Sequence, residues 1–101
     1  MSKNKVQEHK NICDMLNSLY IKKNHDYGDS FHTTFLEYGM VMPLIRLEDK
    51  FQRLKSLYKV GSMVKEESIK DTLMDLANYA IMTIIELEEK KDADQNKTGR
   101  T

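Results

Sequence analysis

Residues 64–90, VKEESIKDTLMDLANYAIMTIIELEEK, contain neither glycine nor proline and repeat apolar side chains at spacings of three and four. The repeating positions are Ile69, Leu73, Leu76, Ala80, Ile84 and Leu87. Five more apolar residues fill most of the surface of the second half: Met74, Ala77, Ile81, Met82 and Ile85. A helix that is apolar on nearly every side lies at the centre of a bundle or at a subunit interface. This stretch therefore predicts one long helix against which the rest of the chain packs.

The remaining segments are also expected to be helical. Four glycines and one proline in 101 residues are few, and the abundant Lys, Glu, Leu and Met favour helices. Helices are predicted over residues 3–23, 35–40 and 43–59, with a loop over 24–30, NHDYGDS, which is rich in turn formers. The helix over 43–59 has an apolar seam: Leu44, Leu47, Phe51, Leu54 and Tyr58. The predicted fold is an all-α bundle of three main helices plus a short one.

Composition limits the organisation and the partners of the chain. One helical domain is expected over residues 1–90, followed by a disordered tail over 91–101, which lacks apolar periodicity. Three main helices leave apolar surface uncovered, so a homodimer or homotetramer is expected to complete the bundle. Sixteen basic and 16 acidic residues cancel, which argues against direct nucleic-acid binding.

Location and redox setting follow from the same composition. No apolar run approaches the roughly 18 residues that span a membrane, and the first ten residues lack the apolar core of a signal peptide. The single cysteine, Cys13, cannot form an intramolecular disulfide, and it is expected to be a small core residue of the first helix. These features predict a cytoplasmic protein without membrane contact.

An acidic stripe marks one face of the helix predicted over 64–90. Its residues lie within an arc of about 80°: Glu67, Asp71, Asp75 and Asn78. The same face continues into the apolar Met82 and Ile85, and therefore into the packed part of the bundle. Because carboxylates four residues apart repel each other, the stripe is expected to have a cationic partner. That partner is either Mg²⁺, which prefers carboxylate oxygens, or the basic residues of the preceding helix: Arg46, Lys50 and Arg53.

Two other groups of polar residues have both a functional and a structural interpretation. Arg46, Asp49 and Arg53 point away from the apolar seam of their helix. The two arginines could bind a phosphate, or could simply pair with Asp49 within the helix. Tyr27 is an aromatic residue in a polar loop, where it would either stack on a ligand or anchor the loop.

Three blocks of the sequence resemble the small phage and prophage nucleotide modification associated domain. They are residues 24–30 (N-x-D-Y-G-x-S), 45–54 (I-R-x-x-D-K-x-x-R-L) and 67–80 (E-S-I-x-D-T-L-x-D-L-A-N-Y-A). That domain in turn resembles the MazG-type all-α nucleoside triphosphate pyrophosphohydrolases. Those enzymes form dimers or tetramers, hold Mg²⁺ with an EExxE pattern and an ExxD pattern, and cleave between the α- and β-phosphates.

The resemblance carries over at some positions and fails at others. Asp75 matches the aspartate of ExxD, and Glu48 with Asp49 matches the leading acid pair of EExxE. The third acid of EExxE falls at Gln52, and the glutamate of ExxD falls at Thr72. The resemblance thus implies either a metal site rebuilt from the acidic stripe and Asp49, or a fold that binds nucleotides without cleaving them.

The residues and the resemblance together predict a Mg²⁺-dependent nucleotide pyrophosphohydrolase, phage-encoded and located in the host cytoplasm. The predicted metal ligands are Glu67, Asp71 and Asp75. Glu67 or Asp49 is the candidate catalytic carboxylate that orients the attacking water. The candidate substrate contacts are Arg46, Lys50 and Arg53 for phosphate, Asn78 for sugar or base, and Tyr27 for base stacking. The alternatives are an oligomer that sequesters a nucleotide signal and a purely structural helical module.

Overall fold

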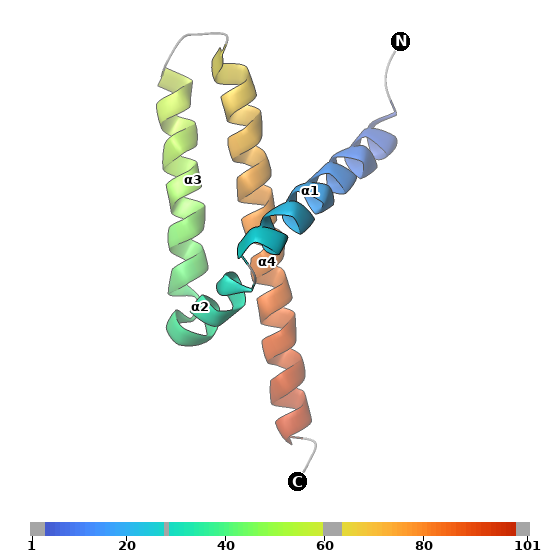
Figure 1. Ribbon diagram of the computed structural model, residues 1–101, viewed down its shortest axis with the longest axis vertical. Coiled ribbons are helices and arrows are strands. Elements are labelled where there is room, and N and C mark those ends of the chain that lie inside the picture. Colours follow the sequence, from blue (N-terminus) through green and yellow to red (C-terminus); the bar gives the residue numbers. More distant parts are fainter. Residues whose placement is uncertain (1–3, 28, 60–63, 99–101) are drawn as a thin grey trace. The chain divides into compact units, whose positions relative to one another are not determined.

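The computed structural model describes residues 4–27, 29–59 and 64–98, apart from the side chains of 25–27, 64–66 and 96–98, and every element in it is an α-helix. The helices are α1 (Lys5–Tyr27), α2 (Ser30–Tyr38), α3 (Val41–Lys59) and α4 (Val64–Thr98) (Figure 1). The predicted all-α fold is confirmed. By its internal contacts the chain divides into two compact units, Met1–Ser30 and Phe31–Thr101. One helical domain over residues 1–90 stays a prediction.

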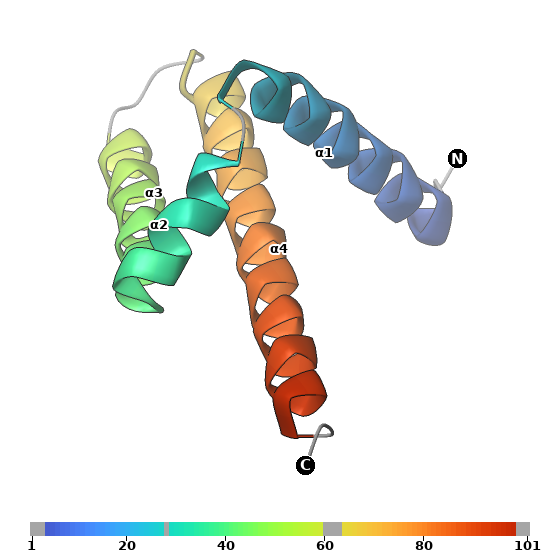
Figure 2. The same ribbon diagram turned by 60° about the horizontal axis from the view of Figure 1, so that its bottom comes forward.

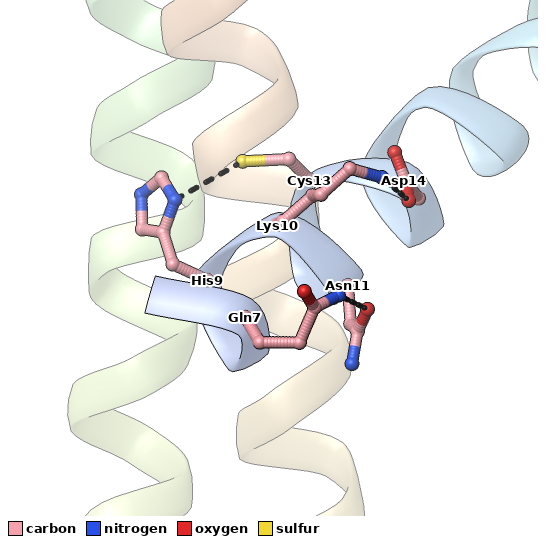
Figure 3. A network of polar contacts seen from close by, with 6 residues as sticks. All are labelled: Gln7, His9, Lys10, Asn11, Cys13 and Asp14. Atoms are coloured by element: carbon pink, nitrogen blue, oxygen red, sulfur yellow. Dashed lines mark hydrogen bonds and ion pairs between the residues drawn. The ribbon is translucent and has the colours of Figure 1, made fainter. Parts of the chain in front are cut away.

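α1 makes up the first unit and is stabilised along its surface by polar contacts within the helix. The Asn4 side-chain oxygen caps it by accepting the backbone N–H groups of Val6, at 3.0 Å, and of Gln7, at 3.3 Å. Three pairs of side chains then meet across one turn: Gln7 with Asn11, Lys10 with Asp14, and His9 with Cys13 (Figure 3). Pairs at this spacing each stabilise a helix by a few tenths of a kcal/mol, on the order of 0.2–0.5.

Two predictions for this unit are wrong. The helix continues to Tyr27, through residues that were expected to start a loop. Extending an existing helix fixes only one more residue for each hydrogen bond gained, so weak turn preferences do not stop it. Cys13 is exposed and does not lie in a core, and its Sγ atom lies 3.7 Å from the His9 Nδ1 atom.

α2 is longer than predicted and ends at a glycine in the left-handed conformation. It begins at Ser30, so residues 30–34, which were expected to precede the helix, belong to it. Gly39 has a φ of 68°, and its N–H donates to the Phe35 carbonyl at 2.7 Å. This arrangement closes the helix and turns the chain into α3. Pro43 lies buried in the first turn of α3, where a missing N–H has no cost.

Gly39→Ala is expected to lower the free energy of unfolding by about 1 kcal/mol, because a Cβ strains a residue with positive φ. Nothing lies within 4 Å of a Cβ built at this position, so the cost is conformational and not steric. Thermal unfolding would show a melting temperature lower by about 4–8 °C. Gly39→Asn is the matched control and should lose less, since asparagine tolerates this conformation better. A melting temperature unchanged in Gly39→Ala would contradict the assignment.

α3 and α4 lie side by side and run in opposite directions (Figures 1 and 2). Besides the buried Met42, the buried and half-buried positions of α3 recur at spacings of four and three: Pro43, Leu47, Lys50, Leu54 and Leu57. Three members of the predicted seam, Leu44, Phe51 and Tyr58, are instead exposed. The seam is thus shifted by one residue at alternate positions, and this shift turns Lys50 towards α4.

The most buried positions of α4 are polar, and only part of the predicted apolar seam, Ile69, Leu76 and Ala80, is half-buried. Thr72, Thr83 and Glu86 are buried, whereas Leu73 and Ile84 are exposed. Each threonine hydroxyl donates to the backbone carbonyl one turn earlier, at 2.7 Å. These hydrogen bonds satisfy the hydroxyls and allow the threonines to be buried without loss.

The C-terminal half of α4 extends well beyond the N-terminal end of α3, which runs antiparallel to it. At a rise of about 1.5 Å per residue, α3 is about 28 Å long and α4 about 52 Å long. Residues 91–98, which were predicted to lie in a disordered tail, continue the helix. Figures 1 and 2 show that α3 runs along only the first half of α4. None of the described helices combines the length and the apolar character that a membrane span requires.

Candidate functional site

The clearest contact between α3 and α4 is an ion pair that involves the acidic stripe. The Lys50 Nζ atom lies 3.4 Å from the Asp75 Oδ2 atom. The two side chains are 27% and 24% exposed, so the pair is partly shielded from water. Interhelical salt bridges of this kind were the alternative to a metal ion as the cationic partner of the acidic stripe. It forms because the observed seam of α3 includes Lys50 in place of Phe51.

The stripe runs from solvent into the packed part of this unit. Glu67 and Asp71 are exposed, whereas Asp75 and Asn78 are half-buried. In the described part of the chain, the carboxylates of Glu67, Asp71 and Asp75 do not converge to within 4.8 Å of one another. An ion here would therefore meet one or two protein carboxylates and several waters, which is how Mg²⁺ is commonly held. The three-ligand assignment stays a prediction.

The other predicted residues are placed as follows. Arg46, Asp49 and Arg53 are exposed on α3, and none of them takes part in the Lys50–Asp75 pair. Tyr27 falls among the side chains outside the described part, so its predicted role in base stacking is not addressed by the structure. The structure thus brings together Lys50 and Asp75 from two helices, with Asn78 one turn further along α4.

An aromatic pair that the sequence analysis did not single out joins α2 to α4. The rings of Phe31 and Tyr79 are stacked, with centroids 6.1 Å apart and an interplanar angle of 26°. Both residues are half-buried, and Tyr79 lies one turn after Asp75. The available signal was the position of Tyr79 directly after Asn78 in the most distinctive block of the sequence. Such a pair offers an aromatic surface near the polar face of α4.

A second polar cluster lies further along α4 and was also missed. The His32 Nδ1 atom of α2 lies 2.6 Å from the Glu86 Oε1 atom and 3.6 Å from the Glu89 Oε2 atom. The stripe was followed only to Met82 and Ile85, but Glu86 and Glu89 return to the same face at 100° per residue. Glu89 lies five full helical turns from Asp71, so counting onward along the stripe would have found the cluster.

The fold and these contacts define an all-α domain whose longest helix presents a row of charged and polar side chains to its neighbours. Residues 23–87, more than half of the chain, match the family described as nucleotide modification associated domain 1, and the chain belongs to that family. The resemblance seen in the sequence is confirmed to this extent. No curated protein and no solved structure matches the chain.

Proposed function

We propose that this protein binds a nucleoside triphosphate together with Mg²⁺ and hydrolyses it to a monophosphate and pyrophosphate. The proposed site is the α3–α4 face, which we define as Lys50, Asp71, Asp75 and Asn78. The observation that carries the proposal is the half-buried Lys50–Asp75 pair on the acidic stripe, in a chain of a nucleotide-related family. The Asp75 carboxylate can bind the metal ion, and the adjacent Lys50 ammonium can bind a phosphate. The pair therefore suits a ligand that contains both a metal ion and a phosphate.

The charges of the α3–α4 face explain how such a ligand would bind. Without a ligand, the Lys50 ammonium offsets the charge of Asp75. Asp75 and Asp71 would hold Mg²⁺, whose charge would replace that offset and leave the Lys50 ammonium to contact a phosphate oxygen. Asn78 hydrogen-bonds the sugar or base from the next turn of α4. The exposed Arg46 and Arg53 of α3 are further candidates for phosphate contact.

The proposed reaction balances without a covalent enzyme intermediate. Mg²⁺ would be held by Asp75 and Asp71 and would supply positive charge that stabilises the phosphate oxygens. A water molecule attacks the α-phosphorus while the bond to the α–β bridging oxygen breaks. Pyrophosphate leaves, and a carboxylate takes the proton of the water. Glu67 or Asp49 is assigned this role, because both are exposed and free to approach a bound ligand.

The wider proposal follows the MazG-like relationship, with a phage-encoded protein acting in the host cytoplasm as a homodimer or homotetramer. Exposed apolar residues on two helices support the oligomer: Leu44, Phe51 and Tyr58 of α3, with Leu73, Ile84 and Leu87 of α4. Side chains of this kind are expected to be covered by another copy.

Nucleotide sequestration without cleavage is the second candidate function. The specific observation in its favour is that Lys50 already neutralises Asp75, while Gln52 and Thr72 stand where the hydrolase pattern has acids. A protein that only binds a nucleotide needs its site charges to be balanced, but it does not need the complete set of acidic metal ligands. Tight stoichiometric binding without product release would identify this function.

The test is a screen of ribo- and deoxyribonucleoside triphosphates for release of pyrophosphate and of phosphate, with and without Mg²⁺. Bound nucleotide is measured in parallel by mass spectrometry of the native protein. We expect Mg²⁺-dependent pyrophosphate release from one or a few substrates. Binding without release would replace the hydrolase by the sequestering protein. Neither binding nor release would leave a structural helical module.

A further inference from the structure

We propose that His32, Glu86 and Glu89 form a binding site for a divalent transition-metal ion, of which Zn²⁺ fits the ligand set best. The site joins the first turn of α2 to the second half of α4. It is separate from the α3–α4 face, since Glu86 lies eleven residues, or about 16 Å along the helix, beyond Asp75. The proposal does not depend on the proposed nucleotide chemistry.

Three potential ligand atoms converge at this point. The His32 nitrogen and one oxygen from each glutamate all lie within 4.8 Å of one another. Tetrahedral coordination at about 2 Å places ligand atoms about 3.3 Å apart. The observed separations from the nitrogen are 2.6 Å to Glu86 and 3.6 Å to Glu89, so they bracket that value. Small side-chain rotations therefore bring all three atoms to coordination distance.

The burial and charge of the cluster favour a cation between these side chains. The Glu86 residue is only 6% exposed, and a buried carboxylate is costly unless a positive group compensates it. Glu89, one turn later, brings a second negative charge towards the same nitrogen. One imidazole nitrogen carries a single proton and cannot satisfy two carboxylates equally. A divalent ion with three ligands balances both carboxylates at once.

The ligand types select the class of metal. An imidazole nitrogen with two carboxylate oxygens suits Zn²⁺ or Mn²⁺, whereas Mg²⁺ prefers oxygen ligands and retains its waters. Three protein ligands leave a fourth position for water or for a small ligand. His32 and Glu89 are 33% and 59% exposed, so an ion has access from solvent.

The test is calorimetric titration of the full chain with ZnCl₂ and, separately, MgCl₂. All variants carry Cys13→Ser, which removes the exposed His9–Cys13 pair as a competing Zn²⁺ site. We expect one Zn²⁺ per chain, with affinity reduced by about tenfold or more in His32→Gln and in Glu89→Gln. Glu89 is exposed, so its variant is expected to fold. Glu88→Gln is the matched control and should bind like the parent.

Visible absorption of Co²⁺ provides a second readout, because its spectrum reports nitrogen and oxygen coordination directly. We expect the spectrum of a Co²⁺ complex to disappear in His32→Gln and to persist in Asp75→Asn, which leaves this cluster intact. Absence of Zn²⁺ binding, equal binding by all variants, or Mg²⁺ binding as tight as Zn²⁺ binding would each overturn the proposal.

Discussion

Asp75→Asn is expected to reduce Mg²⁺-dependent pyrophosphate release by about 100-fold or more, the range seen when a charge-stabilising group is removed from an active site. The amide keeps the size of the side chain but removes the negative charge that would hold the metal. Folding should survive, because both partners of the lost Lys50–Asp75 ion pair keep about a quarter of their surface in contact with water, so that its loss costs on the order of 1–3 kcal/mol. The measurement is initial-rate kinetics beside thermal unfolding of the same preparation.

Two further variants separate the chemistry from the ion pair. Lys50→Met breaks the same pair but keeps the carboxylate, so it should retain turnover while raising KM through the loss of a phosphate contact. Asp92→Asn changes an exposed aspartate on the same helix and should behave like the parent. Normal turnover in Asp75→Asn would show that the α3–α4 face is not the metal site. Equal losses in Asp75→Asn and Lys50→Met would point to the ion pair itself.

The helices were predictable because each has local signals that agree with the final fold. The scarcity of glycine and proline and the apolar residues at helical spacing predicted the start of α4 at residue 64 and a break between α2 and α3. The extents of α1 and α2 were underestimated. Turn-forming residues such as those of 24–27 weaken a helix by only fractions of a kcal/mol, on the order of 0.5 each, and neighbouring turns overcome this.

Which residues of α3 and α4 are buried was harder to predict than the presence of the two helices. Two registers fit the α3 sequence at spacings of three and four, and they share Leu47 and Leu54. Hydrophobicity favoured the register with Phe51, but the structure uses the one with Lys50. The choice depends on a partner from another helix, Asp75, which no local pattern of α3 reveals.

The sequence allowed one of the two polar clusters on α4 to be predicted but not the other. Asp75 was identified because its stripe is regular over three carboxylates and an amide. Glu86 does not stand out in the sequence, because it follows the largely apolar stretch 80–85 and directly precedes the charged end of the helix. Its burial depends on His32, which lies 54 residues earlier in α2. Pairings over such distances come from tertiary packing and not from periodicity.

His32→Leu is expected to destabilise the fold by about 1–3 kcal/mol, which is the cost of leaving a buried polar group without its partner. The Glu86 carboxylate is buried, and the His32 nitrogen is 2.6 Å from it. For a domain of this size the loss corresponds to a melting temperature lower by about 5–20 °C. The measurement is thermal unfolding of the full chain in the presence of EDTA, so that no metal ion contributes.

The matched control removes both partners. His32→Leu combined with Glu86→Leu leaves no unpaired charge in the buried part of the cluster, so most of the lost stability should return. Equal destabilisation in the single and double variants would instead attribute the effect to lost packing between α2 and α4. Recovery of stability in the double variant would show that His32 stabilises the fold by compensating the charge of Glu86.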